Sequence, residues 1–140
     1  MKRKKRVCII AVVGVLLLTF SISWANNRLM SSIQQICLAY QVNISGSDMN
    51  LVSHPNGTQE LIINVQSGRN NFDRIMLIGF YAAGKAIKYH QATIEKVTII
   101  VSMEFKGNSS INATATMAEI INYVDGNCSS SDFVRKLKFS

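Results

Sequence analysis

The sequence predicts a single small α+β domain behind an apolar N-terminal segment. Three observations support this. The chain of 140 residues suits one domain. Segments with helical periodicity alternate with pairs of short predicted strands. The chain begins with a run of basic residues followed by an uncharged apolar run. The predicted order is helix, hairpin, helix, hairpin, helix. Its simplest packing is a four-stranded antiparallel sheet with the helix of residues 71–91 across one face.

Residues 1–25 are predicted to be an export signal or a single transmembrane anchor. The cations of Lys2–Arg6 precede Val7–Phe20, which carries no charge. Small residues on both sides of Trp24 favour signal-peptidase cleavage between Ala25 and Asn26. If uncut, residues 7–25 would form about 28 Å of helix, close to the roughly 30 Å of a hydrocarbon core.

Cleaved or retained, the leader places residues 26–140 outside the cytoplasm. The basic end stays on the cytoplasmic side of the membrane. The domain is therefore expected to be periplasmic or secreted, or else anchored to the inner membrane with its N-terminus in the cytoplasm. The net charge of +7 comes mostly from this leader, since the rest of the chain has ten cations and eight acidic residues. No nucleic-acid-binding surface is predicted.

The exported part begins with a helix and a hairpin. Apolar residues from 27 to about 42 follow one helical face; these are Leu29, Ile33, Ile36, Cys37 and Tyr40. Strands are predicted at 49–53 and 59–66, around a His54-Pro55-Asn56-Gly57 turn. The helix of residues 71–91 is apolar on most sides, so we expect it to be largely buried, with Asn71 as its cap.

A second hairpin is predicted from two runs of alternating apolar and polar residues. Odd-numbered positions of 97–105 and 111–117 are mostly apolar and should face the core. A short helix at 118–125 then stops at Gly126. A last helix at 132–137 is predicted to be capped by Ser131.

Cys37 and Cys128 are the two cysteines of the exported part, because Cys8 lies in the leader. Outside the cytoplasm such a pair usually oxidises, so a Cys37–Cys128 disulfide is predicted. The alternative is two separately buried free thiols. Neither belongs to a CxxC pair, which argues against thiol–disulfide catalysis.

The sequence offers no constellation for catalysis. The two histidines, His54 in a turn and His90 at a helix end, are expected to be exposed. No metal-ligand spacing, phosphate-binding loop or nucleophile elbow occurs. The carboxylates, Glu60 among them, have plain explanations as strand-edge charges, caps or solvated groups. We therefore predict no enzyme activity, no cofactor and no metal.

The function that fits this pattern is a non-catalytic module of the cell envelope that binds a protein partner. The open sheet face or an edge strand would make the contact. The face is predicted to be polar and uncharged at Thr98, Ser102, Thr114 and Thr116, although plain solvent exposure explains these residues equally well.

Two alternatives stay open. One is an extracytoplasmic small-ligand-binding domain with an apolar pocket between sheet and helix, lined by Met76, Phe80, Met103 and Met117. An ordinary core accounts for the same residues. The other is a secreted inhibitor or hydrolase whose site the sequence does not display.

Overall fold

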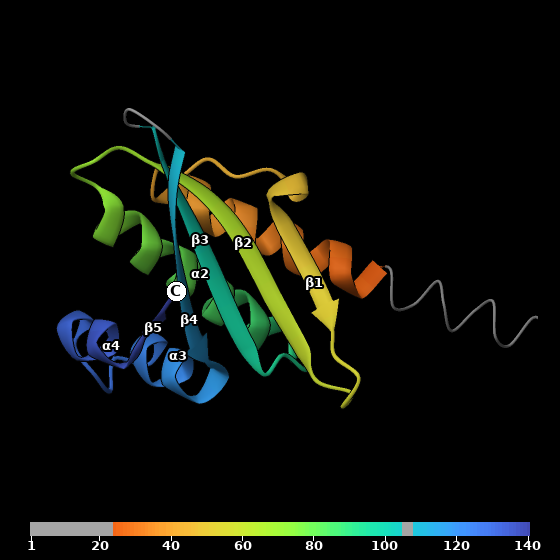
Figure 1. The fold of residues 1–140 in the computed structure, drawn as a ribbon. Coiled ribbons are helices and arrows are strands. Elements are labelled where there is room, and N and C mark those ends of the chain that lie inside the picture. The colour runs from red at the N-terminus through yellow and green to blue at the C-terminus, as the bar shows by residue number, and fades with distance from the viewer. Residues whose placement is uncertain (1–23, 105–107) are drawn as a thin grey trace, which may run out of the picture.

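A computed structural model describes residues 24–104 and 108–140, and shows a small α+β domain in which helices pack on a five-stranded mixed sheet (Figure 1). A helix covers residues 24–39. The elements after it are a 3₁₀ turn η1 (Gly46–Asp48), β1 (Met49–Ser53), β2 (Gln59–Ser67), α2 (Phe72–His90), β3 (Lys96–Glu104), β4 (Asn108–Thr116), α3 (Met117–Val124), α4 (Ser130–Lys136) and β5 (Lys138–Phe139).

The strands lie side by side in chain order, but they are not all antiparallel. β1 and β2 form the predicted hairpin, as do β3 and β4, whereas β2 and β3 are parallel neighbours. The prediction of a four-stranded antiparallel sheet was therefore wrong. The 19 residues of α2 measure about 28 Å, and the nine of β3 about 30 Å. A helix of this length carries the chain back to the end of the sheet where β2 began, which makes the next strand parallel.

A fifth strand, β5, was not predicted. It pairs antiparallel with β4 through Ala113 and Thr114. The backbones of Asn112 and Ser140 extend this pairing with two hydrogen bonds, of 3.0 and 3.1 Å. With only two residues, β5 is too short to leave an alternating pattern in the sequence.

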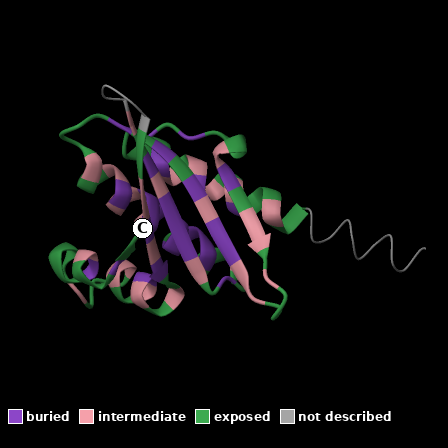
Figure 2. Ribbon diagram, viewed as in Figure 1, coloured by how far each residue is buried: buried purple, intermediate pink, exposed green. Residues whose placement is uncertain are grey.

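One face of the sheet is covered by the two long helices, which lie together behind it in Figure 1. The strand residues that point to them are buried: Leu61, Ile63, Val65, Val97, Ile99, Val101, Ala113 and Ala115. The predicted odd-numbered core face of the second hairpin is confirmed at its five buried positions, while Phe105 lies outside the described residues. No helix among the described residues lies over the opposite face, and its residues alternate with the buried ones along each strand (Figure 2).

α2 packs against both the sheet and α3. Its glycines permit close contact, because a Cβ on Gly79 would lie 3.1 Å from Ile99 Cδ1 in β3. A Cβ on Gly84 would lie only 2.5 Å from Ile120 Cγ2 in α3. The helix begins after Asn71, whose side chain makes no capping hydrogen bond, and ends at Gln91 in the left-handed conformation.

The helix of residues 24–39 buries Leu29, Ile33 and Cys37 in the core. Its last helical residue, 39, lies about three residues before the predicted boundary. Gln41, shortly after it, has the left-handed backbone conformation with φ 64°. The leader, apart from its last two residues, lies outside the described residues. The proposed cleavage bond between Ala25 and Asn26 falls within this helix. Among the helices described, none combines the length and apolarity needed to cross a bilayer.

The C-terminal helices are capped by side chains. Thr116 accepts a hydrogen bond from the Glu119 backbone N–H and begins α3. Ser129 does the same for Asp132 and begins α4, so the cap lies two residues before the predicted Ser131. Phe133 of α4 is fully buried and stacks on Tyr123 with ring centroids 4.5 Å apart, which fastens α4 to α3.

Candidate functional site on the open face of the sheet

A nearly buried carboxylate, Glu60, lies near one end of the open face. It is the second residue of β2, beside Val52 of β1 and Lys96 of β3 in the strand register. Only 9% of the residue is exposed. A charged group at such a position must be paired and hydrogen-bonded, because burial of an unpaired charge is strongly unfavourable.

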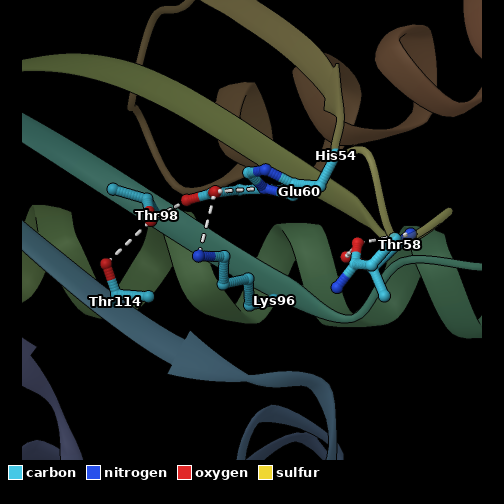
Figure 3. Close-up of polar contacts among 7 residues, drawn as sticks. His54, Thr58, Glu60, Lys96, Thr98 and Thr114 are labelled. Carbon is cyan, nitrogen blue, oxygen red and sulfur yellow. Dashed lines mark hydrogen bonds and ion pairs between the residues drawn. The ribbon is translucent and has the colours of Figure 1, made fainter.

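Four side chains form a hydrogen-bonded network with this carboxylate (Figure 3). Thr98 donates to Oε1 over 2.6 Å. His54 Nε2 and Lys96 Nζ lie 3.0 and 3.2 Å from Oε2. Thr114 Oγ1 is 2.7 Å from Thr98 Oγ1. Since the single hydroxyl proton of Thr98 is given to Glu60, Thr114 must be the donor to Thr98.

The network holds Glu60 in its ionised form. Burial raises the pKa of Glu60. The hydrogen bonds from Thr98, Lys96 and His54 together lower it by more than burial raises it, so the pKa lies below its usual value. An ionised carboxylate only accepts, so His54 Nε2 carries a proton. The negative charge of Glu60 is balanced by Lys96. The arrangement therefore holds Glu60 and its partners in fixed positions on the open face.

The four residues predicted for an interaction face lie on this face but differ in availability. Thr98 is buried within the network and Thr114 is half-buried. Ser102 is exposed, with no side-chain hydrogen bond among the described contacts. Thr116 is exposed, but its hydroxyl is bound to the Glu119 carboxylate over 2.8 Å. Of the four, Ser102 is the one free to meet a partner.

Two members of the network were misread from the sequence. Glu60 was explained as a strand-edge, capping or solvated charge without a functional role, yet it is almost buried. His54 was expected to be exposed and idle, yet it is partly buried and bonded to Glu60. The hairpin turn brings the two together and was visible in the sequence. Lys96 and Thr98 reach Glu60 only through the parallel pairing of β2 and β3.

His90 was also misread, although it lies outside this site. Its Nε2 is 2.7 Å from Ser32 Oγ, which joins the end of α2 to the helix of residues 24–39. Met76 and Phe80, predicted as lining for an alternative apolar pocket, have no exposed surface. A ligand at those two residues would have to displace core side chains.

Both predicted disulfide partners are free thiols in the structure. Cys37 is buried, and this burial raises the pKa of its thiol to about 11. Cys128 is half-buried in the connection between α3 and α4. The two thiols are separate in the structure, and the Cys37–Cys128 disulfide stays a prediction that chemical labelling can test.

The described part of the chain contains no group of three or more His, Cys, Asp or Glu residues arranged to hold a metal ion.

Comparisons with family models, with curated proteins and with solved structures gave no match.

Proposed function

We propose that residues 26–140 form a non-catalytic module of the cell envelope that binds a protein partner on the open face of its sheet. The observation that carries this proposal is the Glu60 network. It joins Glu60 to four other side chains near one end of a sheet face that no described helix covers.

The composition of the face suits contact with a protein. Beyond the network, the face continues along β2 and β3 with exposed, uncharged groups at Asn64, Gln66 and Ser102. Ile62 and Ile100 are half-buried between them and offer apolar surface. Interface centres are poor in unpaired charge and rich in well-packed groups. The internal neutralisation of Glu60 by Lys96 lowers the cost of covering this charge with a partner.

The fixed geometry is a second argument for binding. Side chains that must be ordered on association cost about 0.5–1.5 kcal/mol each. Glu60, Thr98 and Thr114 are already ordered by their mutual hydrogen bonds. A partner meeting this surface loses less side-chain entropy than it would on a mobile face.

Placement in the cell envelope rests on the leader in residues 1–25. A periplasm-dependent reporter enzyme fused after Ser140 tests this part alone. We expect the reporter to be active with the full chain and inactive when Lys2–Phe20 is deleted. Equal activity in the two fusions would contradict export.

Partner binding is tested by site-specific photocrosslinking in the cells that make the protein. A photoreactive residue replaces Asn64 or Ser102 on the open face, and Lys136 of α4, which is also exposed, serves as the control. We expect one discrete crosslinked product from both open-face positions and none from Lys136. No product from either open-face position, or the same products from all three, would overturn the proposal.

A further inference from the structure

A second surface, on the helical side of the molecule, has the features of a ligand site. α2 carries a stripe of residues on one helical face at Arg74, Leu77, Ile78, Tyr81 and Lys85. Leu77, Ile78 and Tyr81 are only half-buried, unlike the fully buried residues of α2 that face the sheet and α3. This part of the helix therefore keeps apolar surface that no described element covers completely.

Three tyrosines from three different elements meet over this stripe. Tyr81 lies between Tyr40, at the end of the first helix, and Tyr123 of α3. Its ring centroid is 5.7 Å from that of Tyr40 and 6.5 Å from that of Tyr123, with the rings edge to face. Tyr123 is held in place by its stack on the buried Phe133. The ring of Tyr123 is thus fixed by the core.

These residues enclose an open hollow of about 590 Å³. That size is within the range of about 300–1,000 Å³ that small-molecule sites occupy. Aromatic and aliphatic side chains form most of its wall. The lining residues are Tyr40, Arg74, Leu77, Ile78, Tyr81 and Tyr123.

Positive charge borders the hollow. Arg74 is part of its lining, and the one hydrogen bond that its guanidinium makes to a described residue is a long one of 3.4 Å to the Tyr40 carbonyl. Lys85 Nζ lies 5.6 Å from the centre of the Tyr81 ring, in cation–π contact. No carboxylate among the described side chains comes within ion-pair distance of either cation. Arg74 keeps donors with which to bind a carboxylate in a bidentate manner.

We propose that this hollow binds small molecules that combine a flat aromatic ring with a carboxylate. The ring would pack on Leu77 and Ile78 and against the tyrosine rings, where offset and edge-to-face contacts are favourable. The carboxylate would meet Arg74. This site is separate from the open sheet face, so either proposal can fail without the other.

Isothermal titration of the full chain with three probes tests the proposal. The probes are 2-naphthoate, the neutral 2-naphthamide, which keeps the ring, and cyclohexanecarboxylate, which keeps the acid. We expect 2-naphthoate to bind, and each of the other two to bind about tenfold more weakly or not measurably. Equal affinity for all three, or no binding of 2-naphthoate up to its solubility limit, would overturn the proposal.

Two variants within the hollow and one control variant outside it assign the binding to this hollow. Arg74→Gln should remove the preference for 2-naphthoate over 2-naphthamide, whereas Arg135→Gln on the exposed surface of α4 should preserve it. Tyr81→Leu should weaken both naphthalene probes. Circular dichroism verifies that each variant is folded. An unchanged preference in Arg74→Gln would place the binding elsewhere and refute the assignment. The chain could instead associate with itself through the surface around Tyr123 and so block probe binding. That outcome would make the hollow a protein interface and would also refute the proposal.

Discussion

Thr98 donates a hydrogen bond of 2.6 Å to the carboxylate of Glu60, across neighbouring parallel strands that the chain connects only by way of α2. This contact joins the two halves of the domain, because each residue belongs to a different hairpin. It also fixes the position of the carboxylate near one end of the open face. The stability of the fold and the shape of the proposed binding face therefore depend on the same residues.

Glu60→Gln should change the pH dependence of stability. The folded pKa of Glu60 is lowered, so its stabilising effect is present above the unfolded value of about 4.3 and is lost as pH falls through the folded pKa. We expect Glu60→Gln to reduce the free energy of unfolding by about 1–3 kcal/mol at pH 7, with a smaller difference at pH 3. Urea unfolding at both pH values measures this.

Glu95→Gln is the matched control, since Glu95 is exposed and its side chain has no described partner. It should leave the free energy of unfolding within about 0.5 kcal/mol of the unsubstituted protein. If the two variants behave alike, Glu60 does not hold the network together.

Gly84→Ala should destabilise the fold by crowding the contact of α2 with α3. The new Cβ would lie 2.5 Å from Ile120 Cγ2 and 2.7 Å from Val124 Cγ2, and both are stiff β-branched side chains. Overpacking of this kind costs about 1–3 kcal/mol, against a gain of about 1 kcal/mol in helix propensity. Thermal unfolding measures the net loss. Gly68→Ala, with nothing within 4 Å of its Cβ, should show none. A Gly84→Ala variant more stable than the unsubstituted protein would refute the close packing.

Ser32→Ala should loosen the first helix from α2. It removes the partner of His90, a hydrogen bond of 2.7 Å in a partly buried place. We expect a loss of about 0.5–1.5 kcal/mol in the free energy of unfolding. The neighbouring Ser31→Ala is the control, because Ser31 is exposed and no described hydrogen bond involves its side chain. Equal stabilities of the two variants would mean that the Ser32–His90 bond contributes nothing.

The two cysteines should differ sharply in reactivity. Burial and a pKa of about 11 keep the Cys37 thiol protonated and shielded, so it should resist alkylation in the native protein. Cys128 is partly accessible and should react first. Peptide mapping after a timed pulse of iodoacetamide measures both. Cysteines that react only after reduction, even in denaturant, would instead establish the disulfide.

Local structure was largely predictable from the sequence because it depends on local signals. The alternation in β3 and β4 identified which residues are buried, and the Pro55–Gly57 turn identified the first hairpin. Apolar residues on most sides of α2 predicted that this helix is buried. Each of these rests on side-chain periodicity or turn chemistry within a few residues.

The pairing of β2 with β3 depended on a different kind of information. The residue pattern of a strand does not identify the strand with which it pairs. The length of α2, close to that of the strands, was the usable signal for a parallel crossover. Missing this pairing hid the Glu60 network, since Lys96 and Thr98 lie beside β2 only in the parallel register. The tyrosine hollow depends on three elements at once and has no sequence signature.

The open face as a binding surface is tested most directly by cysteine accessibility in the cell envelope. Ser102→Cys and Lys136→Cys place single reporters on the open face and on α4, both at exposed positions. Labelling with a maleimide is compared between envelope preparations and purified protein, above the background of the unsubstituted chain. We predict that Ser102→Cys is protected in the envelope and reactive when purified, whereas Lys136→Cys reacts in both. Equal labelling of Ser102→Cys in the two preparations would show that nothing covers this face.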